Sequence, residues 1–378
     1  METSKNSQRH PELVSGSLVS TSPRFQGIAG DPVSSTGRND GSITNRVIRS
    51  PLMLYPLTFK PIFKEIIWGG TAIRPFKGLA PSEIKTGESW ELSHVKDNYS
   101  VVANGALEGM TIDELIGQFG AKLTGENVLQ RFGATFPLLI KFIDTRENLS
   151  IQVHPDDQLA MERHKSLGKT EMWYVVNAAP GAGLYSGLSQ QIDPDEYIRR
   201  IDDGSIIDVL QRYEVKEGDV FFLPAGRIHA IGAGCFIAEI QQTSDITYRI
   251  FDYNRKDASG NSRELHTGLA KDAIDYTVYP DYRTVYTPVQ NQIVPLIQCN
   301  YFTTNLLELD KPKERDCTAL DSFIIYICMG GKATLRDNKN YELTIQQGQT
   351  VLIPAETLSI TITPEPHVKL METYIGRS

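Results

Sequence analysis

The stretch at residues 149–155, with the sequence LSIQVHP, constrains this chain more than any other. Apolar and β-branched residues alternate with polar ones there, which predicts a short strand. Side chains two residues apart share a face of a strand, so Gln152 and His154 point to one side and Val153 points to the other. Pro155 lacks the N–H that would continue the ladder, and the strand should end there. The sequence thus predicts a strand end that presents an imidazole beside an amide.

Two later residues complete a set of metal ligands. Glu171 lies in the strand-like run KTEMWYVV, and His229 ends the sequence PAGRIH. Two imidazoles, a carboxylate and an amide oxygen suit a zinc-like divalent ion that still has room for water or a substrate. This donor set indicates a metal-dependent enzyme. The candidate metal ligands are Gln152, His154, Glu171 and His229.

Charge and composition exclude several classes of partner. The net charge is -8 and no basic stripe stands out, which argues against nucleic-acid binding. No apolar run approaches the roughly 20 residues that span a membrane. The cysteines have no CxxC spacing, so we interpret them as buried free thiols in a reducing compartment. We expect a cytoplasmic enzyme, and the sequence leaves its oligomeric state open. The four cysteines are Cys235, Cys299, Cys317 and Cys328.

Helix signals are few and lie apart from one another. Thr111 with Glu114 three residues later forms a capping box, which predicts a helix. Residues 155–165 are polar and prone to form a helix. Asp193 precedes a proline and two acidic residues, which predicts a helix running towards Leu210. Most other segments alternate as strands do, so the chain should be mainly β with helical insertions.

The strand and turn before His229 recur near the C-terminus. The sequence GDVFFLPA at residues 218–225 has the same layout as GQTVLIPA at residues 348–355, 130 residues later. At that offset His229 falls on Ser359. The second copy keeps the strand and the turn but lacks the ligand, so we expect one metal ion per chain.

The pattern G-x5-P-x-G-x2-H at residues 218–229 has the form of the second cupin motif. Cupins are small double-sheet barrels with a metal in the mouth. The first cupin motif normally offers His-x-His and then a Glu, whereas this chain has Gln152-x-His154 and Glu171. The chain therefore resembles a cupin with one altered ligand.

That substitution narrows the resemblance. Together with LSIQVHP at residues 149–155, K-x-E at 169–171 and D-x-T-Y-R at 245–249, it resembles type I phosphomannose isomerases. The resemblance covers about residues 54–378 and looks like the shorter bacterial form, without the large helical insert. It implies a mainly β fold of two cupin-like, jelly-roll barrels with helical insertions, the second barrel without metal ligands.

The resemblance also implies domains and roles. We expect a disordered N-terminal extension at residues 1–52, because its composition cannot bury enough apolar surface. A catalytic metal-binding domain should follow at 53–290, and a degenerate cupin-like domain at 291–378. The four candidate ligands would hold a single Zn²⁺. Arg249 would be the active-site arginine, with Lys169 and Glu239 in the same pocket.

The implied activity interconverts mannose 6-phosphate and fructose 6-phosphate through an enediolate. Such a reaction needs a base for the C–H proton and positive charge where the oxyanion develops. Arg249 cannot usefully lose its proton, so electrostatic support is its natural role. Glu239 is a candidate proton carrier, with a water on the metal as the alternative. Ser150 and Lys141 are candidates for binding the phosphorylated hexose.

Other interpretations stay open at this point. Gln152 could merely end the strand, and Arg249 could pair with Asp252 on the surface. Trp90 and Trp173 are interpreted as core residues rather than sugar platforms. Two histidines and a carboxylate also suit a cupin-type oxygenase with non-haem iron. A sugar-binding cupin without catalytic activity is the third possibility.

Overall fold

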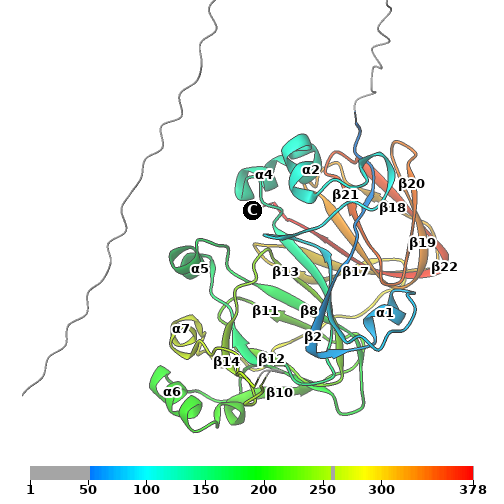
Figure 1. Ribbon diagram of the computed structural model, residues 1–378. Coiled ribbons are helices and arrows are strands. Elements are labelled where there is room, and N and C mark those ends of the chain that lie inside the picture. The colour runs from blue at the N-terminus through cyan, green and yellow to red at the C-terminus, as the bar shows by residue number, and fades with distance from the viewer. Residues whose placement is uncertain (1–51, 257–259, 378) are drawn as a thin grey trace, which may run out of the picture. The chain divides into compact units, whose positions relative to one another are not determined.

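The computed structural model of this chain describes residues 52–256 and 260–377. By their contacts the residues fall into two units, Met1–Ser50 and Pro51–Ser378, and all described residues belong to the second. The disordered extension expected at residues 1–52 lies outside the described residues, apart from Leu52. Strands dominate the described unit, so the expected mainly β class is confirmed (Figure 1).

A seven-stranded sheet forms the middle layer, in the order β15-β11-β8-β13-β6-β3-β2. Every neighbouring pair in it is antiparallel. Its strands are β2 (Ile62–Gly70), β3 (Thr86–Leu92), β6 (Leu138–Asp144), β8 (Glu171–Ala178), β11 (Val220–Leu223), β13 (Cys235–Gln242) and β15 (Arg283–Thr284).

A five-stranded sheet faces one side of this layer, in the order β10-β9-β12-β7-β14. The stretch at residues 149–155 forms β7, which ends before His154 as the proline predicts. The strands of this sheet are β7 (Ile151–Val153), β9 (Gly183–Leu188), β10 (Leu210–Glu214), β12 (His229–Ile231) and β14 (Tyr248–Phe251).

An eight-stranded sheet covers the other side of the middle layer. Its main path is β1-β21-β19-β22-β17-β16, with β18 paired to β22 and β20 paired to β19. The first strand of the described residues thus joins a sheet otherwise built from the C-terminal region. Its strands are β1 (Leu57–Thr58), β16 (Ile293–Gln298), β17 (Thr303–Leu309), β18 (Lys313–Asp316), β19 (Ile324–Asp337), β20 (Glu342–Gln346), β21 (Thr350–Ile353) and β22 (Ser359–Tyr374).

The alternation of side chains in β13 explains how the middle layer serves two cores. Ile237 packs in one apolar cluster with Leu184 of β9 and Ile231 of β12, on the side of the five-stranded sheet. Phe236 and Ala238 pack in another cluster with residues of the eight-stranded sheet. Since alternate residues of a strand point to opposite faces, Glu239 and Gln241 point towards the five-stranded sheet.

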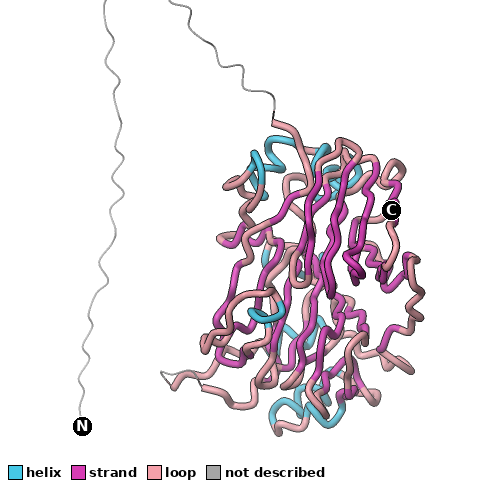
Figure 2. The backbone as a smooth tube through the Cα atoms, turned by 90° about the vertical axis from the view of Figure 1, so that its right-hand side faces the viewer, coloured by secondary structure: helices cyan, strands magenta, loops and turns pink. Residues whose placement is uncertain are grey.

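Helices cover the edges and the outer face of the sheets (Figures 1 and 2). Tyr197 of α6 and Ala270 of α7 pack against Val153 and Ile250 on the outer face of the five-stranded sheet. The short elements are α1 (Ile73–Phe76), η1 (Gly105–Leu107), α2 (Ile112–Phe119), α3 (Ala121–Thr124), α4 (Glu126–Phe132), α5 (Asp157–His164), α6 (Pro194–Asp202), η2 (Ile206–Val209) and α7 (Thr267–Ala273), with the hairpin strands β4 (His94–Val95) and β5 (Asn98–Tyr99).

The helix signals in the sequence are largely confirmed. Thr111 and Glu114 form the predicted capping box of α2. Asp193 caps α6, and its carboxylate accepts from two backbone N–H groups of the first turn. The prediction that α6 continues towards Leu210 is wrong, because α6 ends at Asp202 and Gly204 adopts a φ of 77°.

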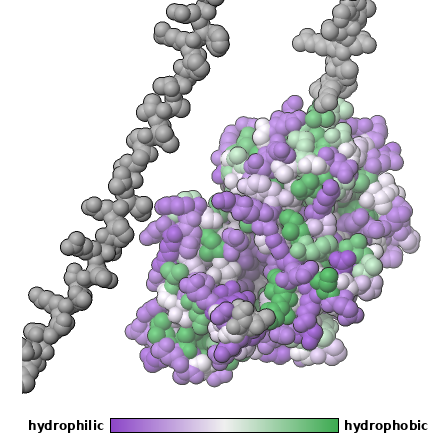
Figure 3. Space-filling view, in the orientation of Figure 1, coloured by the Kyte–Doolittle hydropathy of each residue, from purple (hydrophilic) through white to green (hydrophobic). Residues whose placement is uncertain are grey.

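Among the described residues, no helix is both long and apolar enough to cross a bilayer. On the face shown in Figure 3, hydrophobic residues are scattered over a largely hydrophilic surface. All four cysteines are free thiols, as the sequence predicts, but only three of them are buried and Cys299 is half-buried.

Gly125 offers a test of how the helices at residues 112–132 pack on the eight-stranded sheet. A Cβ on Gly125 would lie 2.2 Å from the backbone oxygen of Asp321, and its φ is 96°. Gly133 also has a positive φ of 59°, but a Cβ there meets nothing within 4 Å. Backbone strain alone costs about 1–3 kcal/mol. We expect Gly125→Ala to lower the free energy of unfolding by clearly more than Gly133→Ala, because it adds a clash.

Urea unfolding of both variants and of the unmodified chain would measure the difference. Equal losses in the two variants would contradict the close contact at Gly125.

Candidate metal centre and active site

One row of side chains crosses the five-stranded sheet and faces the middle layer. His229 in β12 is directly opposite Gln152 in β7, and Arg249 in β14 is opposite Gln152 from the other side. Directly opposite residues on neighbouring strands share a face, so all three side chains point the same way. His154 lies two residues after Gln152 and points to the same side. The pairing register thus places Arg249 one strand from Gln152 and two strands from His229.

A second row crosses the middle layer and faces the first. Glu239 in β13 is directly opposite Trp173 in β8 and Lys141 in β6, and Lys141 is in turn opposite Trp90 in β3. Glu171 begins β8, two residues before Trp173, and so lies on the same face. Polar groups from both sheets therefore meet in the space between them.

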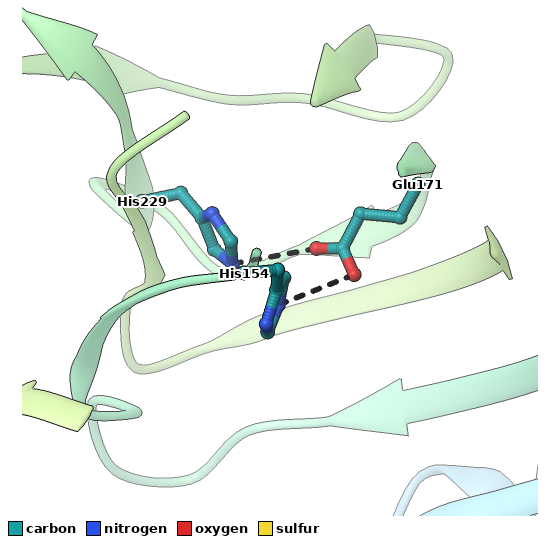
Figure 4. A group of neighbouring side chains, drawn as sticks. All are labelled: His154, Glu171 and His229. Atoms are coloured by element: carbon teal, nitrogen blue, oxygen red, sulfur yellow. Dashed lines mark ion pairs between the residues drawn. The ribbon is translucent and has the colours of Figure 1, made fainter. Parts of the chain in front are cut away.

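Three of the predicted ligands converge on one point (Figure 4). The Nε2 atom of His154 lies 3.5 Å from Oε2 of Glu171, and Nε2 of His229 lies 3.4 Å from Oε1 of the same carboxylate. The ligand atoms all lie within 4.8 Å of one another. All three residues are buried, with exposed fractions of 2%, 0% and 1% for His154, Glu171 and His229.

Backbone carbonyls orient both imidazoles. Nδ1 of His154 donates to the Ile246 carbonyl at 2.9 Å, and Nδ1 of His229 donates to the Arg227 carbonyl at 2.7 Å. With Nδ1 occupied, each Nε2 keeps its lone pair for a metal. Burial lowers the pKa of His229 to about 4 and the pKa of His154 well below its ordinary value, with the charge of Lys169 adding to both shifts. Both rings are therefore neutral at neutral pH, which is the form that binds metals.

Glu171 supplies the test of whether a cation fits here. Neither of its buried oxygens has a hydrogen-bond partner of ordinary geometry, and the ammonium of Lys169 lies 3.2 Å from Oε2. Burial and the charge of Glu239 raise the pKa of Glu171 to about 7. A buried carboxylate without hydrogen bonds is costly unless a cation compensates it. A divalent ion between Glu171 and the two Nε2 atoms would remove that cost, so these residues fit a metal.

Gln152 and Lys169 border the same point. Nε2 of Gln152 lies 3.2 Å from Nε2 of His229, and a half-turn of the amide would bring its oxygen to that place. The ammonium of Lys169 lies 3.1 Å from Nε2 of His154. The structure therefore brings all four predicted ligands and Lys169 together.

Glu239 and Lys141 form a buried pair beside the ligands. Nζ of Lys141 lies 3.2 Å from Oε1 of Glu239, while Trp173 donates its indole N–H to Oε2 at 2.9 Å. Burial raises the pKa of Glu239, but the charges of Lys141 and Lys169 outweigh it, so the pKa is lowered. Burial lowers the pKa of Lys141, but the carboxylates of Glu239 and Glu88 raise it by more, so the pKa of Lys141 is raised overall. Both groups are therefore charged at neutral pH.

A cavity of about 230 Å³ connects these groups with solvent. Arg249 is half-buried at its wall, where Nη1 donates to the Glu264 carbonyl at 2.9 Å and the buried Nε has no partner. Arg249 does not pair with Asp252, which binds Arg255 and Arg263 instead. The predicted site residues that line the cavity are Arg249, Glu239, Lys169, Gln152, Ser150 and Lys141.

Some wall residues were not predicted from the sequence. Glu88 lines the cavity and accepts from the indole N–H of Trp90 at 2.6 Å, and Trp90 lines it as well. Their two-residue spacing in β3 places them on one face, which was the available signal. Arg263 also lines the cavity, but it comes from a loop without any recognisable pattern. Trp173 is fully buried, as the core interpretation expects, whereas Trp90, which was also interpreted as a core residue, is largely buried but lines the cavity.

The C-terminal copy of the motif shows no comparable cluster. Ser359 stands at the start of β22, where the repeat places the position of His229. Across residues 52–256 and 260–377, His154, Glu171 and His229 form the one group of three histidine, cysteine or acidic side chains close enough to hold a metal. That the second copy binds no metal of its own stays a prediction.

Comparison with known families gives two matches along the chain. Residues 57–175 match the family model described as phosphomannose isomerase type I, catalytic domain. Residues 292–374 match the model described as mannose-6-phosphate isomerase, cupin domain. The expected cupin-type fold is therefore confirmed.

Individual relatives agree with the family models. The mannose-6-phosphate isomerase ManA of Bacillus subtilis is 41% identical over 251 residues, which are 66% of this chain and 78% of that protein. The putative mannose-6-phosphate isomerase YvyI of the same organism is 34% identical and covers 81% of this chain and 95% of its own length. A crystal structure of the mannose 6-phosphate isomerase from Bacillus subtilis superimposes with a TM-score of 0.75 at 31% identity, covering 84% of this chain and 99% of that chain.

Removing either histidine should abolish tight metal binding. Each imidazole contributes one of few donors, and the loss of a mere supporting contact already costs about 10- to 100-fold in metal affinity. We expect His154→Ala and His229→Ala each to lower zinc affinity by more than about 100-fold. Zinc content after dialysis and competition with a chromophoric chelator would measure this.

His164→Ala is the matched control, because His164 is bonded to the Tyr248 hydroxyl and lies outside the ligand cluster. Stoichiometric zinc in both ligand variants would contradict the metal site.

Proposed function

The chain belongs to the mannose-6-phosphate isomerase family, and on that premise we propose that it interconverts mannose 6-phosphate and fructose 6-phosphate with one Zn²⁺ as cofactor and an enediolate stabilised by Arg249. One observation carries the proposal. The same cavity is lined by Arg249, Glu239 and Lys169, and it borders the buried ligand cluster. A cation site, a fixed guanidinium and an ionised carboxylate are the parts that an aldose–ketose isomerase needs.

The reaction moves hydrogen between two neighbouring carbons of the open-chain sugar. A base removes the proton from C2, the electron pair forms a C1–C2 double bond, and the C1 carbonyl oxygen becomes an oxyanion. The proton then returns to C1, and the hydroxyl proton on O2 moves to O1. Both sugars have the same atoms, so no oxidant or reductant is required. The enzyme must hold one proton briefly and stabilise one negative charge.

Arg249 is assigned to the negative charge. Its guanidinium borders the cavity, and Nη1 is held by the Glu264 carbonyl at 2.9 Å. Burial and the charge of Arg263 lower the pKa of Arg249, but a guanidinium titrates so high that it stays protonated. A donor fixed in advance stabilises developing charge without having to reorganise.

Glu239 is assigned to the proton, with Lys169 beside it. A carboxylate held by Trp173 and Lys141 is ionised at neutral pH and can accept a proton. Lys141 and Ser150 are the proposed contacts of the phosphorylated hexose, because both line the cavity. Nζ of Lys169 lies 3.2 Å from Oε2 of Glu171. Its positive charge would stabilise the ionised Glu171 carboxylate and an anionic substrate nearby.

Zinc is the proposed cofactor, held by Gln152, His154, Glu171 and His229. Two imidazoles, a carboxylate and an amide suit this ion. Once bound, it would supply Lewis acidity to the sugar oxygens. Residues 53–290 are the proposed catalytic domain and residues 291–378 the proposed degenerate domain.

Activity should depend on the metal. The coupled assay follows fructose 6-phosphate formed from mannose 6-phosphate. A strong chelator should abolish turnover and added zinc should restore it, because the proposed site needs a metal ion between its ligands. Oxygen consumption in the same preparation separates isomerase from oxygenase. Binding of the sugar phosphate without turnover would identify a binding protein, and full activity in the chelated enzyme would contradict the metal dependence.

Loss of the guanidinium should lower kcat rather than binding. We expect Arg249→Ala to reduce kcat by about two to three orders of magnitude, the scale seen when one such donor is removed. Arg249→Lys should recover only part, since a point charge cannot reproduce the planar fork. Zinc content should stay unchanged, because Arg249 is outside the ligand cluster.

Steady-state kinetics on zinc-loaded variants would decide the role of Arg249. A raised KM with an unchanged kcat would show that Arg249 only binds the phosphate.

A further inference from the structure

Arg249 lies on an edge strand whose outer side is closed by a histidine. β14 is the last strand of the order β10-β9-β12-β7-β14, so its outer backbone groups have no neighbouring strand. At Arg249 both groups nevertheless have a partner. The N–H of Arg249 donates to Nδ1 of His266 at 3.2 Å, and the N–H of His266 donates to the Arg249 carbonyl at 2.7 Å. His266 thus takes the place of a strand residue at this position.

The direction of these bonds affects the inner side of the strand. Because the N–H and C=O of Arg249 both point outwards, its pairing with Gln152 is of the type without direct hydrogen bonds. In antiparallel sheets this type brings the opposing side chains closer together. The two hydrogen bonds between His266 and the Arg249 backbone therefore keep the Arg249 side chain beside Gln152, in the row that contains His229.

The same short segment also holds the end of the arginine. The carbonyl of Glu264, two residues before His266, accepts from Nη1 of Arg249 at 2.9 Å. Residues 264–266 therefore fix Arg249 at its backbone and at its guanidinium. An arginine held at its backbone and at one guanidinium nitrogen has fewer conformations to lose when it meets developing charge.

The imidazole of His266 makes no other contact in the described residues as close as its hydrogen bond to Arg249. His266 is the N-cap residue of α7, but its side chain makes no capping hydrogen bond. Nε2 lies 4.0 Å from a Glu264 oxygen, and the Tyr248 ring is 6.3 Å away between centroids. The closest polar contact of the ring is the one to Arg249.

We propose that His266 is a positioning residue for Arg249, and that its Nδ1 acceptor aligns the guanidinium with the candidate metal centre. The proposal rests on the proposed function, in which Arg249 stabilises the enediolate. It assigns to His266 a role in kcat, although His266 neither lines the cavity nor belongs to the group of His154, Glu171 and His229.

The test compares two replacements of similar polarity. Asn carries its polar atoms on Cγ, as the imidazole carries Nδ1, so His266→Asn can still accept from the Arg249 N–H. Gln carries them one bond further out, so His266→Gln lacks an acceptor at that place. Small misplacements of a catalytic group cost up to about 100-fold in rate. We expect His266→Gln to lower kcat about 10- to 100-fold with little change in KM, and His266→Asn to retain most of it.

A double variant shows whether the effect passes through Arg249. If it does, Arg249→Ala with His266→Gln should be no slower than Arg249→Ala alone. Multiplying losses would overturn the proposal, because His266 would then act independently. Zinc content is measured in every variant, and it should equal that of the unmodified enzyme.

His94→Ala is the matched control. Nδ1 of His94 accepts from the Phe136 N–H at 3.1 Å, a bond of the same kind, far along the chain from Arg249. We expect His94→Ala to lower stability without lowering kcat. A similar fall in kcat in this control would mean that any lost backbone bond slows the enzyme, and it would overturn the proposal.

The outcomes separate this proposal from the proposed function. If Arg249→Ala leaves kcat unchanged, the catalytic role of Arg249 fails and the positioning role fails with it. If Arg249→Ala is slow while His266→Gln is as fast as the unmodified enzyme, only the positioning role fails.

Discussion

The buried carboxylate of Glu171 is the constraint on which the site depends. It lies between two neutral imidazoles with no hydrogen bond of ordinary geometry, and the ammonium of Lys169 is 3.2 Å away. Such a charge is tolerated in a protein interior only beside compensating positive charge. The surrounding groups follow from this need, since His154 and His229 turn their Nε2 atoms towards Glu171 while backbone carbonyls hold the opposite sides of both rings.

The two-residue period of the strands builds the site with little irregular structure. Every second residue of a strand points into the space between the sheets. Along one strand, the inward-pointing residues can therefore be apolar in the core and polar at the cavity. In β13, Ile237 fills the core while Glu239 reaches the cavity, and both lie on the same face. Antiparallel register then aligns such residues across neighbouring strands. Strand pairing thus positions most of the site residues, and loops supply the remaining contacts.

Prediction from sequence succeeded where the signal was local. The strand that carries Gln152 and the capping box at Thr111 each follow from residues close together in the chain. The role of Arg249 as a cavity residue followed from family resemblance, and its position in the structure agrees. The sequence could not reveal that residues 264–266 clasp Arg249, because that contact depends on which strand ends at the sheet edge. The end of α6 was misplaced because its start signal at Asp193 does not fix its length, and the chain leaves the helix at Gly204, where φ is positive.

The pairing of β1 with β21 has a consequence for the way the protein is made. Leu57 is fully buried and pairs with Leu352. The first strand of the described unit can therefore pair only after β21, one of the last strands, has been synthesised. A ribosome adds about 5–20 residues per second, so tens of seconds pass between the emergence of the two strands. Throughout that interval an apolar segment near the N-terminus has no partner strand, and sheets closed by such distant contacts form slowly. The eight-stranded sheet can therefore be completed only when translation is nearly finished, while the ligand-bearing strands β7 to β14 have already left the ribosome.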